Sequence, residues 1–540
     1  MNRKYNVLFI FVDSVRTYFS NDDRGRLEIM DQFSRDSVEC LNVVTSAPST
    51  FMSISAMMTG TPAYLLNRNY NDFLYDETTT ISLPSMLKKE GYNLYNFWMA
   101  PISRVTMKDL LPCVPRKYWP KKFKHADWWS NAKINDLVSN TLKKIDHHNR
   151  PNFFFVNYNC REDKKTSEIV AENIEKFREY GYTKENTITV LCSDHGYPDP
   201  DKVTGNPSFY KLNKLGHDLV LTDDNVMIPF FIQYPDCLPI DVKSLFSTLD
   251  IMPTILDILS LDHSVCRYGN SMLPIINGVP EDIEKNSLRL HRCDSRLAFQ
   301  KGKGTAIRNS DYKYIYYHDN FFGDLKEEFF DLANDKLEEN NLVKSNEQRH
   351  IEELQKFKME FRKSEEEAMI YQEEYLFKKF QNRYLSDLRD VRNVLIIDSA
   401  YFVFINMLTK ILHLVDQQIN IFVLNISEKA SLFEATALIK DDDKAKLDIE
   451  TFFLNFNKTK DTQLIIFPSY KKNNADYDKL SSLISKMNIN VLRINYNLVK
   501  DDNNSFIRRV AHAYKDIPFL IYEPLNLLKF ILKKTVNIFK

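Results

Sequence analysis

The stretch ITVLCSDHG (188–196) points to the fold of this chain, because an unbroken apolar run is followed at once by an aspartate, a histidine and a glycine. A second run, NVLFIFVD (6–13), has the same form and also ends in a carboxylate. Strands that are apolar on both faces are typical of a parallel sheet covered on both sides. Ligands bind such sheets beyond the carboxyl ends of the strands. Asp13, Asp194 and His195 are therefore the first candidates for a functional site.

Further apolar runs alternate with helical patterns in the first part of the chain: YNLYNFW (92–98), NFFFVNY (152–158) and PFFIQYP (229–235). This alternation predicts the α/β class, with a mostly parallel sheet sandwiched between helices. The tail repeats the pattern on a smaller scale at NVLIID (393–398), INIFVLN (419–425), QLIIFP (463–468) and NVLRINY (489–495). We expect a second, smaller Rossmann-like α/β domain there.

The distribution of glycine and cysteine divides the chain. All 12 glycines lie at or before Gly323, and all seven cysteines lie before residue 294. We therefore predict a first domain over 1–344 and a small domain over 389–540. Between them, the charged segment 345–388 carries apolar residues at three- and four-residue spacings, which predicts a helical linker arm. Because the tail has no glycine, it cannot form a GxGxxG turn or a P-loop.

The composition excludes several classes of protein. With 540 residues, 44% of them hydrophobic, the chain is expected to fold into two domains. The formal net charge is -1, which does not support binding of nucleic acid. The apolar run at 6–13 is too short for a signal peptide or a membrane span, so we expect a cytoplasmic protein. The cysteines form no CxxC pair and suit a reducing compartment.

The pair Asp194-His195 follows a predicted strand, and Gly196 would allow the backbone to turn so that both side chains face one cation. Asp13 closes another strand, and a metal ion would compensate for burying its charge. The alternative for Asp13 is an ordinary cap on a helix that begins near Val15, a role that Ser14 could also fill.

A cluster of hydroxyl side chains occurs in STFMSISAMMTG (49–60), just before and within a predicted helix of small residues that ends at Thr59-Gly60. A hydroxyl at a helix N-terminus gains from the helix dipole, and a metal ion would further favour its ionised form. Helix capping is the alternative, because Ser and Thr cap helices far more often than they attack substrates.

These three pieces, in this order, resemble the alkaline phosphatase/sulfatase superfamily. Three later blocks continue the resemblance: STLDIMPTILDILSL (247–261), GNSMLPIINGVP (269–280) and RNSDYKYIYYHDN with EEFFDLANDKLEENNL (308–342). The resemblance covers the first domain and not the tail. It implies an alkaline phosphatase-like fold and a metal-dependent enzyme that acts on phosphate or sulfate esters.

The nucleophile can be placed in two registers. The family's nucleophile stands nine residues before the Thr-Gly that ends its helix, which selects Thr50 and puts Ser53 on the serine of the family's motif. The competing register through SAPST (46–50) selects Ser46. Sulfatases have an arginine in a C/S-x-P-x-R motif whose first residue is oxidised to formylglycine. Neither register supplies that arginine, and Ile54 occupies its place in the first register. The resemblance therefore implies the phosphoethanolamine and phosphoglycerol transferase branch, which uses a threonine.

By this resemblance, the metal ligands would be Asp13, Thr50, Asp194 and His195, with zinc or manganese favoured over calcium or magnesium. His217 falls where the superfamily places a lysine or histidine and would protonate the leaving oxygen, although it could be an ordinary loop residue. The expected phosphate contacts are Arg16, Ser53, Arg161 and Lys313. For Arg16 and Lys313, a surface ion pair is the alternative.

The predicted function is a metal-dependent phosphotransferase or phosphodiesterase, with a phosphate ester as substrate and a glycan or lipid-linked molecule as a candidate acceptor. A sulfatase-like ester hydrolase and a non-catalytic binding module of a glycan-assembly complex are the alternatives. The segment 525–540 alternates apolar residues with lysines, which would suit either contact with an anionic membrane surface or packing on its own domain. The oligomeric state is not predicted.

Overall fold

The computed structural model describes residues 5–18, 24–66, 80–98, 110–112, 115–118, 120, 130–147, 149–160, 165–198, 221–279, 289–294, 303–317, 326–384, 393–398, 420–425, 434–437, 463–468 and 490–494. The chain divides into two compact units. The first extends to Ala368, and the second runs from Met369 to Tyr514. The boundary falls within a long helix, inside the segment that we predicted to be a linker.

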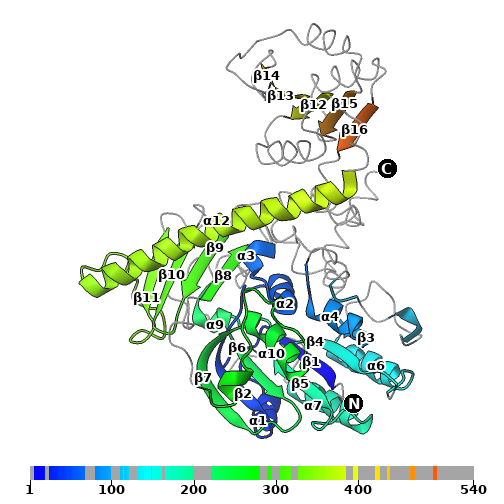
Figure 1. Cartoon of the computed structure of the whole chain (residues 1–540). Coiled ribbons are helices and arrows are strands. Elements are labelled where there is room, and N and C mark those ends of the chain that lie inside the picture. The colour runs from blue at the N-terminus through cyan, green and yellow to red at the C-terminus, as the bar shows by residue number, and fades with distance from the viewer. Residues whose placement is uncertain are drawn as a thin grey trace, which may run out of the picture. The chain divides into compact units, whose positions relative to one another are not determined.

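A seven-stranded sheet forms the centre of the first unit, in the order β3-β4-β1-β5-β6-β2-β7 (Figure 1). Five strands match the predicted runs: β1 (Asn6–Asp13), β3 (Asn93–Phe97), β4 (Asn152–Asn159), β5 (Thr187–Cys192) and β6 (Met227–Gln233). Two were not predicted, β2 (Val38–Val44) and β7 (Ile240–Ser247). Both carry charged residues among the apolar ones, so they lack the unbroken apolar pattern.

The predicted α/β class with a mostly parallel sheet is confirmed. Strands β3, β4, β1 and β5 pair in parallel, and β2 pairs in parallel with β7. Strand β6 is the exception, because it runs antiparallel to both β5 and β2. An apolar run indicates burial on both faces but does not reveal the direction of the strand.

Side chains of β1 alternate between two hydrophobic cores. Phe9 and Phe11 face the core that contains α2 (Thr50–Thr59), α4 (Leu83–Lys89) and α10 (Ile251–Ile258). Leu8 and Ile10 face the core that contains α1 (Glu28–Ser34), α6 (Asn131–Leu142) and α7 (Thr166–Glu179). This alternation is the period of two that a strand imposes, and it explains why the whole run is apolar.

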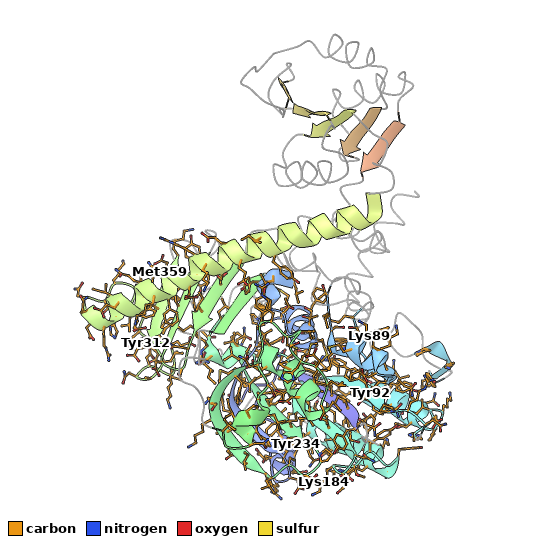
Figure 2. All side chains as sticks on the ribbon, in the orientation of Figure 1. Lys89, Tyr92, Lys184, Tyr234, Tyr312 and Met359 are labelled. Carbon is orange, nitrogen blue, oxygen red and sulfur yellow. The ribbon has the colours of Figure 1, made fainter. Side chains whose placement is uncertain are left out.

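A second sheet, antiparallel, has the order β11-β10-β9-β8. It consists of β8 (Arg289–Asp294), β9 (Lys303–Arg308), β10 (Tyr312–Tyr317) and β11 (Glu327–Asp331). Strands β10 and β11 are the hairpin expected from block 308–342. One face of the sheet packs on helix α12 (Gln348–Tyr384) through Tyr314, Phe329 and Phe357. Figure 2 labels Tyr312 on β10 and Met359 on this helix.

The other short elements of the first unit are α3 (Ala63–Leu66), the 3-10 turns η1 (Arg116–Tyr118) and η4 (Thr248–Asp250), α9 (Asp223–Val226) and α11 (Leu273–Ile276). A single long helix, α12, occupies most of the predicted linker. None of the helices in the described ranges is both long and apolar enough to cross a membrane. The segment 525–540 lies outside the described residues.

The second unit contains a five-stranded sheet in the order β14-β13-β12-β15-β16. Four strands match the predicted runs of the tail: β12 (Asn393–Asp398), β13 (Asn420–Asn425), β15 (Gln463–Pro468) and β16 (Asn490–Ile494). These four pair in parallel, and β14 (Glu434–Ala437) is antiparallel to β13. The helices expected between the strands lie outside the described residues, so the Rossmann-like domain remains a prediction.

Gly269 lies against the backbone of η4, and its lack of a side chain allows this close approach. A Cβ at Gly269 would lie 2.1 Å from the carbonyl oxygen of Leu249 in η4, which packs against α2. We expect Gly269→Ala to lower the free energy of unfolding by about 1–3 kcal/mol through overpacking. Urea denaturation followed by circular dichroism measures the change.

Gly304→Ala is the matched control, because its Cβ would meet the flexible end of Leu221 at 3.2 Å and the ring of Tyr317 at an ordinary contact distance of 3.5 Å. It should change stability by a few tenths of a kcal/mol. Equal stabilities of the two variants would contradict the close packing at Leu249.

Candidate active site

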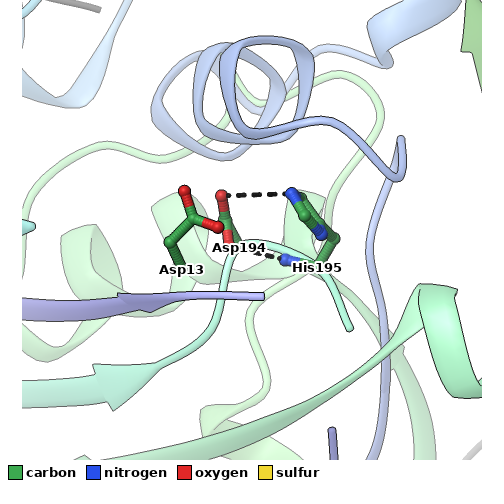
Figure 3. A group of neighbouring side chains, drawn as sticks. All are labelled: Asp13, Asp194 and His195. Carbon is green, nitrogen blue, oxygen red and sulfur yellow. Dashed lines mark hydrogen bonds and ion pairs between the residues drawn. The ribbon is translucent and has the colours of Figure 1, made fainter. Parts of the chain in front are cut away.

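Two carboxylates and an imidazole meet where β1 and β5 end. The two strands are parallel neighbours, with Phe11 opposite Cys192, so Asp13 and Asp194 emerge at the same edge of the sheet. One ligand atom from each of Asp13, Asp194 and His195 lies within 4.8 Å of the other two. Figure 3 shows the three side chains directed towards one another. The three residues predicted from the strand ends are therefore neighbours.

The backbone after β1 holds Asp194 in place. Ser14 adopts a left-handed conformation with φ of 66°, which is uncommon for a residue other than glycine. Its N–H donates to Asp194 Oδ1 at 3.1 Å, and the next N–H, of Val15, donates to Ser193 Oγ at 3.0 Å. The sharp turn at Ser14 thus points two donors at the loop that follows β5.

The hydrogen bonds of His195 define which ring nitrogen can bind a cation. Its Nδ1 lies 2.7 Å from the carbonyl oxygen of Gly196. A carbonyl oxygen can only accept, so Nδ1 carries the proton and Nε2 presents its lone pair. Nε2 lies 3.6 Å from Asp194 Oδ2 and 3.3 Å from Thr50 Oγ1. Metal-binding histidines typically donate the N–H of their other ring nitrogen to a carbonyl or carboxylate oxygen in this way.

Gly196 is required for a reason other than the expected turn. A Cβ on this residue would lie 2.1 Å from the carbonyl oxygen of Asp224 in α9. The Gly196 N–H donates to the carbonyl oxygen of Asn225 at 2.8 Å. The absent side chain therefore allows α9 to pack directly on the backbone beside His195.

The hydroxyl of Thr50 lies between Asp13 and His195. Thr50 is the first residue of α2, and its Oγ1 donates to Asp13 Oδ2 at 3.2 Å. The helix ends at Gly60 in a left-handed conformation, as the Thr-Gly pair suggested. Ser46 is fully buried instead, and its Oγ accepts from the N–H of Ala63 at 2.8 Å. The geometry therefore favours Thr50 over Ser46.

The electrostatics of the group suit a cation. Burial raises the pKa of the Asp194 carboxyl; His195 opposes this shift, and Asp13 adds to it. Asp194 is fully buried, and its Oδ2 has no hydrogen-bond partner among the described residues. A buried carboxylate oxygen needs a positive partner. The donor set of two carboxylates, an imidazole and a hydroxyl fits a divalent ion such as zinc or manganese.

Ser53 does not occupy the position expected of a substrate contact. Its Oγ donates to the carbonyl oxygen of Asp194 at 2.6 Å and lies 2.7 Å from Thr45 Oγ1, with no solvent exposure. Its expected contact with a substrate therefore stays a prediction. Because α2 is anchored to the Asp194 loop by this bond, Ser53 fixes the distance between Thr50 and the carboxylates.

Lys313 also differs from the prediction. Its Nζ is fully buried and contacts Asp223 Oδ1 at 2.6 Å, Glu338 Oε1 at 2.5 Å and the carbonyl oxygen of Leu221 at 2.9 Å. The contact with Leu221 is a hydrogen bond, and the two contacts with carboxylates are ion pairs. The alternative of an ion pair is present, although buried and not at the surface, and the expected phosphate contact stays a prediction.

The remaining predicted residues are only partly placed. Arg16 is fully buried near the end of β1, and its Nε donates to the carbonyl oxygen of Tyr197 at 2.7 Å. His217 and Arg161 lie outside the described residues, so their roles stay predictions. Our sequence reasoning did not give Ser193 a role, although it belongs to the SDHG block and its hydroxyl joins the loop after β5 to β1.

Comparison with known proteins connects this geometry to a family. The model of the family "N-sulphoglucosamine sulphohydrolase, C-terminal" matches residues 218–366. A Delta 4,5-hexuronate-2-O-sulfatase of Bacteroides thetaiotaomicron is 24% identical over 219 residues, which cover 35% of this chain and 42% of that protein. The matched region thus spans less than half the length of this relative.

Solved structures share the fold. A 2-O GAG sulfatase superposes with a TM-score of 0.51 at 15% identity, covering 68% of this chain and 92% of its own. A protein solved with its substrate D-glucosamine-2-N,6-O-disulfate has a TM-score of 0.50 at 13% identity, covering 68% and 98%. The family model and the sequence relative agree with the shared fold, and the chain is similar to sulfatase-like proteins of the alkaline phosphatase/sulfatase superfamily.

Proposed function

We propose that the first domain, predicted over 1–344, is a metal-dependent enzyme that cleaves or transfers a phosphate ester through Thr50. The observation that supports this most directly is the position of the hydroxyl. Thr50 Oγ1 lies 3.2 Å from Asp13 Oδ2 and 3.3 Å from His195 Nε2, at the first residue of a helix. An acidic partner, a cation-binding group and the positive end of a helix dipole all favour an ionised oxygen there.

The residues of this chain would act in two steps. A divalent ion held by Asp13, Asp194 and His195 would supply Lewis acidity at the hydroxyl and at the ester. Thr50 Oγ1 gives its proton to Asp13 Oδ2, to which it donates a hydrogen bond, and attacks phosphorus, and the bond to the leaving oxygen breaks with its electron pair. Water or an acceptor hydroxyl then attacks the phosphothreonine and loses a proton, and Thr50 Oγ1 leaves and takes up the proton held by Asp13. His217 remains the predicted donor of a proton to the first leaving oxygen.

The identity of residue 50 favours phosphate over sulfate. Oxidation of a cysteine or a serine side chain can give the aldehyde of formylglycine, whereas threonine carries a methyl group on Cβ and would give a ketone. The position of the sulfatase arginine is occupied by Ile54, which is fully buried. Thr50 is therefore suited to direct attack, as in the transferase branch.

A sulfate ester is the second candidate, and the comparisons favour it. The matching family model and the sequence relative both carry names of enzymes that act on sulfated sugars. A sulfated glycan would then be the substrate, with Thr50 again as a direct nucleophile. A non-catalytic domain is the third candidate, and it would need neither the metal ligands nor Thr50.

Substitution of Thr50 tests its assignment as the nucleophile. We expect Thr50→Ala to lower kcat by about 10³-fold or more on the preferred ester, because among the described residues Thr50 is the hydroxyl that contacts both Asp13 and His195 Nε2. Thr50→Ser should retain measurable activity. The rates are measured with p-nitrophenyl phosphate, bis(p-nitrophenyl) phosphate and p-nitrophenyl sulfate, with and without a chelator.

Ser46→Ala is the control for the competing register and should leave kcat near that of the unmodified enzyme. Full activity of Thr50→Ala would exclude this residue as the nucleophile. A preference for the sulfate ester would overturn the choice of phosphate and leave the superfamily unaffected.

Substitution of Asp194 tests its assignment as a metal ligand. In Asp194→Asn, Oδ1 can still accept from Ser14 and His195, while the unpartnered Oδ2 becomes an amide. We expect the metal-free variant to be at least as stable as the unmodified protein. An ion at about 100 times its Kd should stabilise the unmodified protein by about 2.7 kcal/mol and should not stabilise this variant.

Thermal unfolding with Zn²⁺ or Mn²⁺, after treatment with a chelator, measures both effects. Asp241→Asn, which changes an exposed aspartate, is the control and should keep the stabilisation by metal. Equal stabilisation of the Asp194 variant would contradict the assigned ligand set.

A further inference from the structure

Four charged side chains form a buried, electrically balanced cluster between the antiparallel sheet and α9. Lys313 contacts Asp223 at 2.6 Å and Glu338 at 2.5 Å. Arg308 contacts the other oxygen of Asp223 at 3.0 Å. The exposed fractions of the side chains are 0% for Lys313, 3% for Glu338, 6% for Arg308 and 24% for Asp223. The cluster is thus largely removed from water.

This cluster is costly to build. Lys313 stands directly opposite Arg308 on the neighbouring strand, and like charges in that position repel each other. Glu338 adopts a left-handed backbone with φ of 58°. Buried ion pairs are weak sources of stability compared with apolar packing, and strained residues persist where the surroundings fix them. These two features point to a role in holding geometry.

The cluster holds α9. Asp223 is the first residue of this helix, and its N–H donates to Glu338 Oε2 at 2.6 Å while its carboxylate binds the two cations. Glu338 therefore binds the backbone of Asp223, and Lys313 binds its side chain. The other end of this helix runs directly into β6, where the carbonyl oxygen of Val226 accepts from the N–H of Thr45 at 2.8 Å, so the cluster fixes the end that begins at Asp223.

The opposite side of α9 holds the loop after β5. The carbonyl oxygen of Asn225 accepts from the N–H of Gly196 at 2.8 Å, and that of Asp224 accepts from Tyr197 at 3.1 Å. The missing Cβ of Gly196 is what allows this approach. The carbonyl group of the same glycine accepts from His195 Nδ1 at 2.7 Å. Any tilt of α9 would rotate this peptide and with it the imidazole.

We propose that Lys313 and Glu338 are positioning residues for the metal-binding histidine, acting through α9 and the backbone of Gly196. The inference rests on the metal site of the proposed function and does not depend on which ester is cleaved. It gives Lys313 a role in the site without contact with the substrate. The cluster belongs to the part of the chain that the sulfohydrolase family model matches, whereas Asp13 and Asp194 lie before it.

Binding of Co²⁺ to the full chain tests this inference without an activity assay. Glu338→Gln keeps the shape of the side chain and an oxygen that can accept from Asp223. Lys313→Met removes the ammonium group and keeps an unbranched side chain. We expect each variant to weaken Co²⁺ binding by about 10–100-fold, as is typical when the orienting partner of a ligand is lost. The visible absorption of bound Co²⁺ should also change, because the orientation of the imidazole changes.

Lys358→Met is the control, since Lys358 forms a lysine–glutamate pair with Glu327 in the same sheet and helix but does not contact α9. It should keep the Kd and the spectrum of the unmodified protein. Urea unfolding of each metal-free protein separates loss of stability from loss of affinity. Unchanged Kd and spectrum in both cluster variants, at a temperature where they are folded, would overturn the positioning role.

The outcomes also separate this inference from the proposed function. If Co²⁺ binds and Asp194→Asn abolishes binding, but no ester is cleaved, the proposed function fails and the positioning role stands or falls on the two cluster variants alone. If the unmodified protein binds no Co²⁺, both are overturned.

Discussion

The parallel pairing of β1 with β5 is the constraint on which the site depends. It brings two strand ends, and so two aspartates, to one edge of the sheet, where one oxygen of Asp194 is buried with no hydrogen-bond donor from the described part of the chain. The negative charges of Asp13 and the fully buried Asp194 destabilise the folded protein when no cation lies beside them. The surrounding bonds from Ser14 and His195 satisfy one oxygen of Asp194 and leave the other directed at His195. Such an arrangement is understandable if a cation completes it.

The sequence predicted this edge because its signal is local. A run such as NVLFIFVD is apolar at every position only if both faces are buried, and the structure places alternate residues in different cores. The residue that follows such a run must then lie at the edge of a sheet. Asp13, Asp194 and His195 could therefore be identified without knowledge of the rest of the fold. Thr50 needed the family resemblance as well, because the count of nine residues back from Thr59 is taken from the position of the family's nucleophile.

The features that the sequence did not predict depend on contacts between residues that are distant along the chain. Lys313 and Ser53 look like polar residues available to a ligand, but their partners lie far away in sequence. Ser53 bonds to Asp194, 141 residues later, and Lys313 bonds to Leu221, 92 residues earlier. No local pattern reports such contacts. The antiparallel direction of β6 was missed for a similar reason, because direction is fixed by the path of the chain between strands and not by the composition of the strand.

These long-range contacts also explain how the region that resembles the sulfohydrolase family can serve a site whose ligands precede it. The antiparallel sheet contributes no residue to the metal group, yet its lysine and the glutamate after it hold the helix on which the Asp-His loop rests. Bonds from Ser14, Val15 and Ser53 hold the Ser193-Asp194 part of this loop. A histidine ligand binds a cation well only if its lone pair points at the ion. Glycine at position 196 lets the helix come close enough to aim it, and the buried ion cluster keeps the helix there. The two features act together: the Cβ of an alanine at 196 would clash with the carbonyl oxygen of Asp224, and without the cluster the first residue of α9 would lose the contacts that hold the helix against this glycine.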